Sequence, residues 1–300
     1  MAYAVSSRYR QGAIDRSLSG VMSKTADTFV LTGCASGIGR HLADVLVGRG
    51  DCVVATDVDA DALSEHADAQ EWPADRAWVR KLDVRDADAW AAVLDETIAA
   101  FGRLDVLVNN AGYLKPGPFL ETAPDEIARQ IDVNTKGVIL GTHAAATIMV
   151  KQRAGHIINI GSFAALGPIP GITVYCGTKY AVRGFSLAVA QELRPFGVYV
   201  TVVSPESVQT PMLAMEAHYD ESAAAFAAPR LLTVDDVSTV ILDRVLNPKR
   251  RRKPFDVFIP RRRGMLARLL DLFPQTTARL FMPGLRKRGL AKQRELREQN

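Results

Sequence analysis

Short apolar runs alternate with longer helical patterns along the chain between residues 28 and 259. Several of the short runs are continuously apolar and rich in β-branched residues, as strands covered on both faces are. Strands are predicted at Thr28–Thr32, Cys52–Thr56, Ala77–Leu82, Leu104–Val108, His156–Ile160, Val198–Val203 and Asp256–Ile259. Helices are predicted near Ile38–Arg49, Ala87–Phe101, Pro124–Arg153, Val174–Phe196 and Val234–Leu246.

Alternating strands and helices predict an α/β domain with a doubly wound parallel sheet, a Rossmann fold with a C-terminal helical appendage. The chain has 300 residues, which suits one large domain better than two small ones. We expect residues 25–260 to form this domain. Residues 1–24 are then an N-terminal extension, and residues 261–300 a basic amphipathic appendage.

Composition limits the class of protein. Hydrophobic residues make up 48% and charged residues 23%, as in a globular protein with a sizeable core. Cys34, Cys52 and Cys176 lie far apart with no histidine at ligand spacing, so neither a disulfide framework nor a metal site is expected. No signal-peptide stretch and no long apolar run occurs, so we expect a cytoplasmic protein without a spanning helix.

The charge is divided unevenly along the chain. Residues 1–243 carry 20 Lys/Arg and 29 Asp/Glu, whereas residues 244–300 carry 17 Lys/Arg and 4 Asp/Glu. An acidic body with a basic tail is unlike a uniformly basic nucleic-acid-binding protein, and no recognition motif accompanies the charge. We therefore expect no nucleic-acid partner.

A glycine-rich turn follows the first predicted strand and opens the first helix, with the sequence Thr-Gly-Cys-Ala-Ser-Gly-Ile-Gly at residues 32–39. Glycines allow a pyrophosphate close to the backbone, and a helix N-terminus supplies unpaired N–H groups and a positive dipole end. The strand-turn-helix context predicts a dinucleotide site whose contacts are Gly33, Ser36, Gly37, Ile38 and Gly39.

The second predicted strand ends at Asp57, about 20 residues beyond the glycines. A carboxylate there accepts hydrogen bonds from the adenosine ribose hydroxyls and repels a 2′-phosphate, and Ser36 offers no cation to such a phosphate. These features favour NAD over NADP. A structural interpretation is also open, in which Asp57 begins a turn and caps the next helix.

From about Phe29 to Ile259 the chain resembles the short-chain dehydrogenase/reductase family. The resemblance rests on the glycine turn and on further motifs in the family's order. These are Leu82-Asp83-Val84, Asn109-Asn110-Ala111-Gly112, Asn134, Ser162 and Tyr175-Cys176-Gly177-Thr178-Lys179. It implies a catalytic group of Asn134, Ser162, Tyr175 and Lys179.

The chemistry of this group can be argued from the residue types. Tyr175 and Lys179 are four residues apart, so a helix places both on one face. A nearby ammonium favours the phenolate of Tyr175, which can then take the proton of a substrate hydroxyl as hydride leaves the adjacent carbon. Ser162 suits hydrogen bonding to the substrate oxygen. The resemblance further implies that Asn134 holds a water linking Lys179 to solvent, and that Lys179 bonds the nicotinamide ribose.

The resemblance also implies further cofactor contacts. Asp83 and Val84 should meet the adenine, the turn Asn109, Asn110, Ala111 and Gly112 should line the adenosine side, and Val208 and Thr210 should lie at the nicotinamide carboxamide. Glu206 follows Pro205 where the family usually has glycine. This departure places the shape of that loop in question, and we expect the Glu206 side chain to point to solvent.

Residues 212–232 form the expected lid over the substrate. Met212, Leu213, Met215, Tyr219 and Phe226 suit a small hydrophobic alcohol or ketone, although methionine is equally at home in a core. His218 is expected to be a polar lid residue and not a catalyst, since Tyr175 fills the role of base.

The tail combines clustered arginines with leucine, phenylalanine and methionine. It predicts two short amphipathic helices broken by Pro274 and by Pro283-Gly284. These helices could pack on the body or on a second subunit of a homo-oligomer, cover the substrate mouth, or lie on an anionic membrane surface.

The leading functional hypothesis is an NAD-dependent oxidoreductase that acts on a hydrophobic secondary alcohol or its ketone. An NADPH-linked ketone reductase is the alternative among enzymes, and Asp57 argues against it. A non-catalytic NAD-binding regulator is the alternative from another class. Such a protein would be expected to lack Tyr175 or Lys179, and both are present.

Overall fold

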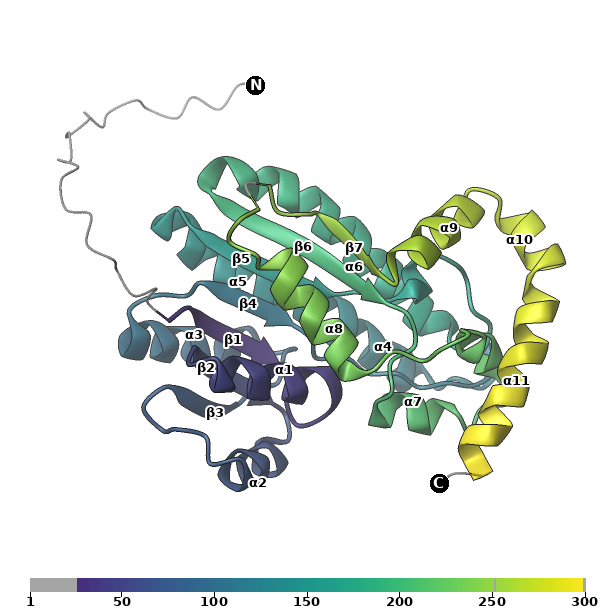
Figure 1. Cartoon of the computed structure of the whole chain (residues 1–300), viewed down its shortest axis with the longest axis horizontal. Helices are drawn as coiled ribbons and strands as arrows, with labels where there is room; N and C mark the ends of the chain where they lie inside the picture. Colours follow the sequence, from purple (N-terminus) through teal and green to yellow (C-terminus); the bar gives the residue numbers. More distant parts are fainter. Residues whose placement is uncertain (1–25, 251, 299–300) are drawn as a thin grey trace.

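The computed structural model describes residues 26–250 and 252–298. Its centre is a seven-stranded parallel sheet in the order β3-β2-β1-β4-β5-β6-β7 (Figure 1). The chain winds outward from β1 in one direction and from β4 in the other, so the doubly wound fold is confirmed. The strands are β1 (Thr28–Thr32), β2 (Cys52–Asp57), β3 (Ala77–Lys81), β4 (Val106–Asn109), β5 (Gly155–Ile160), β6 (Val198–Pro205) and β7 (Asp256–Ile259).

Helices cover both faces of the sheet because its strands are apolar on both faces. Successive side chains of a strand point to opposite faces, and Val30 and Leu31 accordingly enter two separate cores. One core is completed by α1 (Gly37–Gly48), α2 (Ala60–Ala69) and α8 (Val234–Val240). The other is completed by α3 (Ala87–Phe101), α5 (Gly137–Gln152) and α6 (Thr173–Leu193).

Three helical segments differ from the sequence prediction. The helix expected over 124–153 is divided into α4 (Pro124–Ile131) and α5 by a π-helical turn, Asp132–Lys136. Another π-helical turn, Ile241–Val245, follows α8. Such bulges insert one residue without breaking the helical pattern, so apolar periodicity does not reveal them. Helix α2 was not among the predicted helices because it is short and Leu63 is its only large apolar residue.

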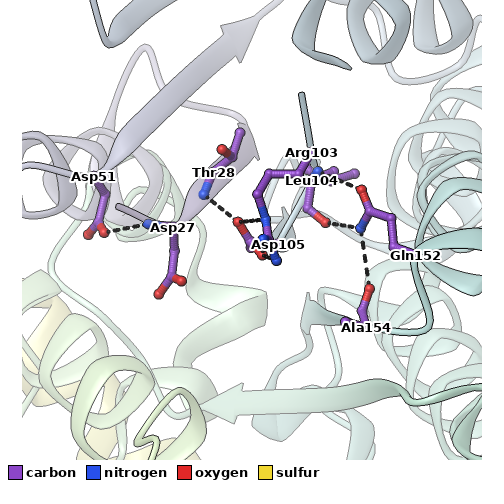
Figure 2. Close-up of polar contacts among 8 residues, drawn as sticks. All are labelled: Asp27, Thr28, Asp51, Arg103, Leu104, Asp105, Gln152 and Ala154. Atoms are coloured by element: carbon purple, nitrogen blue, oxygen red, sulfur yellow. Dashed lines mark hydrogen bonds and ion pairs between the residues drawn. The ribbon is translucent and has the colours of Figure 1, made fainter. Parts of the chain in front are cut away.

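A polar network holds the amino ends of β1 and β4 (Figure 2). The Asp105 carboxylate accepts from the Thr28 backbone N–H at 2.9 Å and from the Arg103 guanidinium at 2.9 Å. The Gln152 side chain, at the end of α5, accepts from Leu104 N–H and donates to Leu104 C=O. This network stabilises the sheet at the amino ends of its strands. The carboxyl ends of the strands, on the opposite side, remain available for a functional site.

Three helices follow the last strand and lie along the side of the molecule towards which the strands point (Figure 1). The prediction of two helices in this segment was wrong, because Pro283 does not end a helix. It occupies the first turn of the last helix, where the missing N–H has no intrahelical partner to lose. The helices are α9 (Arg261–Asp271), α10 (Pro274–Leu280) and α11 (Met282–Glu298), and we call them the tail.

The tail packs on the body through glycines at two crossing points. A Cβ on Gly264 of α9 would lie 2.2 Å from Phe258 Cβ. A Cβ on Gly289 of α11 would lie 1.7 Å from Ala223 O, in the 3₁₀ turn Asp220–Phe226. Helix α11 and the 3₁₀ turn therefore approach so closely that only a glycine fits at position 289. Among the described residues, no helix is both long and apolar enough to cross a membrane.

Candidate active site

A cavity of about 930 Å³ opens at the carboxyl ends of the strands. Its inner end is lined by the glycine turn and Asp57, its middle by Ser162, Tyr175 and Lys179, and its outer wall by α7 (Pro211–Glu216) and the tail. Ligands of doubly wound folds bind at this edge, where the strand order reverses between β1 and β4. The cavity is therefore the candidate active site.

The glycine turn is built by close backbone approach. Gly33 has φ +71°, and a Cβ there would lie 2.8 Å from Ala111 Cα. A Cβ on Gly39 would lie 2.2 Å from Gly33 O, so the first turn of α1 can lie on the strand-helix loop only without a side chain. Asn110 connects this turn to β4 by donating to Thr32 O at 2.9 Å and Gly33 O at 3.0 Å.

The N-terminus of α1 fits a phosphate group. Ser36 is the N-cap residue, yet its side chain makes no capping hydrogen bond, and the first turn of the helix carries no acidic residue. Ser36, Gly37 and Ile38 all line the cavity. Unpaired N–H groups and the positive dipole end thus face the space in which the resemblance expects a pyrophosphate.

Asp57 lines the cavity at the carboxyl end of β2. Its carboxylate accepts from Ala35 N–H at 2.8 Å and from Asp59 N–H at 3.0 Å. These bonds fix its orientation beside the glycine turn. The expectation that Asp57 caps the next helix was wrong, since Asp59 is the N-cap of α2 and accepts from Ala62 N–H.

Several predicted cofactor contacts lie outside the cavity lining. Asp83 is held by a two-pronged ion pair with Arg85, which lowers the pKa of the Asp83 carboxyl. Val84 packs against Gly137 of α5. Asn109 is buried and donates to Asn159 Oδ1 at 2.9 Å, a bond that supports adjacent strands. Gly39 is buried and also lies outside the lining. The predicted contacts that line the cavity are Gly33, Ser36, Gly37, Ile38, Asp57, Asn110, Ala111, Gly112, Val208 and Thr210.

The catalytic candidates Ser162, Tyr175 and Lys179 come together. Ser162 follows β5, while Tyr175 and Lys179 lie one turn apart on α6. The Lys179 ammonium donates to Ile160 O at 2.9 Å and lies 5.5 Å from the centroid of the Tyr175 ring. Lys179 is only 4% exposed, so the backbone of β5 fixes the position of a buried cation beside the tyrosine.

Burial dominates the electrostatics of this group. It lowers the pKa of Lys179 to about 8. It also raises the pKa of Tyr175 above its usual value, while a hydrogen bond with Ser162 lowers that pKa and the charge of Glu216 raises it. Burial disfavours the charged form of each group. Ionisation of Tyr175 at neutral pH therefore requires positive charge in the cavity.

Asn134 lies in the π-helical turn between α4 and α5 and is fully buried. Its side chain accepts from Tyr113 N–H and donates to Tyr113 O, both at 2.7 Å, and also donates to Thr178 Oγ1 at 3.2 Å. Asn134 does not line the cavity, and these bonds connect the loop after β4 to α6. The structure thus places Asn134 next to the catalytic helix and not in contact with the space a substrate would fill.

Comparison with known proteins agrees with this geometry. Residues 27–220 match the sequence model of the short chain dehydrogenase family. The chain belongs to the short-chain dehydrogenase/reductase family. It is 34% identical over 212 residues to a cyclopentanol dehydrogenase of Comamonas testosteroni, covering 70% of this chain and 85% of that protein. It is 38% identical over 184 residues to a 3-alpha-(or 20-beta)-hydroxysteroid dehydrogenase of Mycobacterium tuberculosis, covering 61% and 69%.

A solved structure extends the comparison. A short-chain dehydrogenase/reductase from Burkholderia phymatum, in complex with NAD, superposes with a TM-score of 0.71 at 25% identity, covering 83% of this chain and 94% of that one. This chain is therefore an oxidoreductase of a family that binds nicotinamide cofactors. The family match ends at residue 220, so the segment from 221 onwards must be interpreted from its own contacts.

Glu206 does not point to solvent, contrary to the sequence expectation. Its side chain is 11% exposed and accepts from Arg263 of α9 at 2.8 and 2.6 Å. In this short-chain dehydrogenase/reductase the residue that replaces the usual glycine connects the loop after β6 to the tail. The basic partner lies 57 positions away, so local sequence gave no signal of it.

The lid residues separate into two groups. Met212 and Leu213 line the cavity, whereas Met215, Tyr219 and Phe226 do not. Phe226 is fully buried in a cluster with Leu213 and with Leu296 of α11, so part of the predicted substrate surface is core. His218 is exposed, as expected of a polar lid residue.

Much of the apolar lining was missed by sequence reasoning. The segment between β5 and α6 and the tail supply most of the outer wall, and neither carries a recognisable motif. Glu216, an acidic residue of the lid, was also missed although its charge is visible in the sequence. Outer-wall residues include Leu114, Phe163, Leu166, Ile169, Ile172, Leu266, Leu270, Met282 and Leu285.

Proposed function

We propose that this protein is an NAD-dependent oxidoreductase that transfers hydride between nicotinamide and a hydrophobic secondary alcohol or ketone. The observation that carries the proposal is a single cavity lined by a glycine turn, a carboxylate at the end of β2 and the group Ser162, Tyr175 and Lys179. An alcohol whose oxygen lies at Tyr175 and a dinucleotide held at the N-terminus of α1 would then share one cavity.

The roles of the side chains follow from their positions. NAD, when bound, supplies the ring that accepts the hydride from the carbinol carbon. Tyr175 accepts the hydroxyl proton in oxidation and returns it in ketone reduction. Ser162 donates a hydrogen bond to the substrate oxygen. Lys179, a buried cation beside the Tyr175 ring, favours the phenolate. Asn134 positions the loop after β4 against α6.

NAD is favoured over NADP by the carboxylate of Asp57. Its two bonds to backbone N–H groups hold it in the cavity beside the glycine turn. A 2′-phosphate there would bring two negative charges together with no basic side chain at Ser36 to compensate. An NADPH-linked reductase would need a cation at this end of the cavity.

The apolar outer wall favours a hydrophobic substrate. The relatives named above act on cyclopentanol and on hydroxysteroids by their names, and an alicyclic alcohol suits walls of leucine, isoleucine and phenylalanine. The experiment is a panel of alicyclic and steroid alcohols with NAD and with NADP, followed by formation of reduced cofactor. Turnover with NAD supports the proposal. If the protein binds NAD but turns over no alcohol or ketone, a non-catalytic NAD-binding regulator would be favoured instead.

We further propose that the exposed face of the tail contacts an anionic membrane surface. Large apolar side chains with more than two-fifths of their surface exposed gather on α9, α10 and the following turn. They are Met265, Leu269, Leu272, Phe273, Leu280 and Phe281, whereas the equally exposed Leu266 lines the cavity. Exposed basic residues surround them, namely Arg261, Arg262, Arg268, Arg279, Arg286, Lys287 and Arg288.

This combination suits a lipid surface better than a protein groove, because each basic side chain near anionic lipid contributes about 1 kcal/mol. Sedimentation with phosphatidylserine-containing and pure phosphatidylcholine vesicles tests it. We expect salt-sensitive binding to the anionic vesicles only, weakened when Arg261 and Arg262 are both replaced by glutamine. Protein that stays in the supernatant at low salt contradicts the proposal. If a homo-oligomer buries this face, the face is an interface with a second copy of the chain and not a membrane contact.

A further inference from the structure

One acidic residue lies at the substrate end of the cavity. Glu216 is the last residue of α7 and lines the cavity with Met212 and Leu213 of the same helix. It is 6% exposed, and its Oε1 atom has no hydrogen-bond partner among the described residues. A buried carboxyl oxygen without a partner is unfavourable, because it has lost its bonds to water and gained none in return.

The surroundings of Glu216 do not compensate its charge. Burial raises the pKa of the Glu216 carboxyl to about 7, and a hydrogen bond with Ser222 of the 3₁₀ turn only partly opposes this. The titratable groups that sense Glu216 are Tyr175 and Cys176 of α6, whose pKa values it raises. No basic side chain of the described residues contributes to the Glu216 pKa. One oxygen of this carboxyl, Oε1, is therefore an acceptor without a donor among the described residues.

The nearby cation of the tail is already paired. Arg263 lines the same cavity, but its guanidinium donates to both carboxylate oxygens of Glu206. The Lys179 ammonium donates to Ile160 O and does not contribute to the Glu216 pKa. A donor for Glu216 must then come from what binds in the cavity.

We propose that Glu216 positions the substrate by accepting a hydrogen bond from a second polar group, a hydroxyl or an ammonium, on the alcohol that Tyr175 oxidises. The substrate class is then a hydrophobic skeleton with a hydrogen-bond donor remote from the reacting carbon. This inference rests on the proposed function, and it deepens it. Glu216 is a specificity-determining residue, while proton transfer stays with Tyr175.

The charge of Glu216 makes this preference dependent on pH. Above pH 7 the carboxylate is ionised, and it then attracts an ammonium and repels a second carboxylate. Below pH 7 the carboxyl is protonated and this discrimination disappears. Preference for a cationic substrate therefore rises with pH through about 7.

The test uses four cyclohexanols that differ only at the carbon opposite the hydroxyl. The substituents are hydrogen, hydroxyl, ammonium and carboxylate. We measure kcat/KM with saturating NAD in the wild type, in Glu216→Gln and in Glu192→Gln, which removes an exposed acid from α6. The wild type should prefer the ammonium and hydroxyl compounds to cyclohexanol and discriminate against the carboxylate. Glu216→Gln should reduce the ammonium preference at least about tenfold and abolish its pH dependence, and Glu192→Gln should change neither.

Three results would overturn the inference. One is an unchanged order of substrates in Glu216→Gln. The others are an equal loss for all four compounds and a changed KM for NAD alone, which would make Glu216 structural or a cofactor contact. The same compounds are also compared by the rise in Tm they cause in the NAD-bound protein. A preference for the ammonium compound that Glu216→Gln removes, without turnover, would keep the subsite and reject the proposed reaction.

Discussion

The inner and outer halves of the cavity are built in different ways. The inner half is made largely of backbone. It consists of strand ends, glycines at which a Cβ would lie within 3 Å of neighbouring backbone atoms, and side chains such as Asn110 that bond to main-chain oxygens. The outer half is made of apolar side chains from α7, the β5–α6 segment and the tail. We therefore expect the inner half to bind the nicotinamide cofactor of the family. We expect the outer half, which can vary without disturbing the inner half, to decide the substrate.

The largest effect is expected where the two halves meet, at Lys179. Lys179→Ala removes the buried cation beside Tyr175 and the bond to Ile160 O. We expect kcat/KM to fall at least about 100-fold, since general acid–base catalysis is lost. Lys151→Ala, at an exposed position of α5, is the control and should be neutral. Equal activities of the two variants would remove Lys179 from the mechanism.

Detachment of the tail should damage only the outer half. Gly289→Ala places a Cβ 1.7 Å from Ala223 O, so α11 must move off the 3₁₀ turn. We expect a loss of about 1–3 kcal/mol in the free energy of unfolding and a raised KM for alcohol, with NAD affinity retained. Gly284→Ala, in the same helix with no atom within 4 Å of the new Cβ, should change neither. Loss of NAD affinity in Gly289→Ala would show that the halves are not independent.

Cofactor choice should respond to the inner half alone. Asp57→Asn keeps an oxygen that can accept from Ala35 N–H but removes the charge. The ratio of kcat/KM with NAD to that with NADP should fall at least about tenfold, as a repulsion of 1.4 kcal/mol is relieved. Parallel measurements on two alcohols check that the shift does not depend on substrate. An unchanged ratio, or a wild type that prefers NADP, contradicts the assignment.

The smallest effect is expected at the ion pair that joins the loop after β6 to the tail. Arg263→Gln leaves Glu206 without its partner, and because Arg263 is 41% exposed the loss in unfolding free energy should stay near 1 kcal/mol. Arg262→Gln, the exposed neighbour, is the control. Chemical denaturation compares the two. Identical midpoints would mean that the pair contributes nothing to docking of the tail.

Most residues that line the inner half were visible in the sequence because their signals are local, although Asp83, Val84 and Asn109 were predicted as contacts and lie outside the lining. A glycine turn between a strand and a helix, and Tyr175 four residues before Lys179, are each contained in a few consecutive positions. Asp57 was also visible in the sequence. The alternative in which it caps the next helix was wrong, because Asp59 is the residue that caps α2. All seven strands were found because their apolar runs are buried on both faces.

The outer half could not be predicted because it depends on contacts between distant segments. Glu206 was expected in solvent, and it pairs with an arginine 57 positions later. Phe226 resembled a substrate contact, and it packs on α11. The π-helical turn that contains Asn134 does not change the spacing of apolar residues in a way that the sequence reveals. Long-range packing of this kind is set by the whole fold and not by a motif.

The central claim is that Tyr175 transfers the proton of an alcohol whose hydride passes to NAD. Tyr175→Phe keeps the ring against Lys179 and removes only the oxygen. The decisive measurement is kcat for an accepted alcohol, together with the Kd for NAD, in this variant and in the wild type. The account predicts that kcat falls at least about 100-fold while the Kd for NAD is unchanged. A variant that retains more than about a tenth of the wild-type kcat would contradict it and would assign the proton transfer to another group.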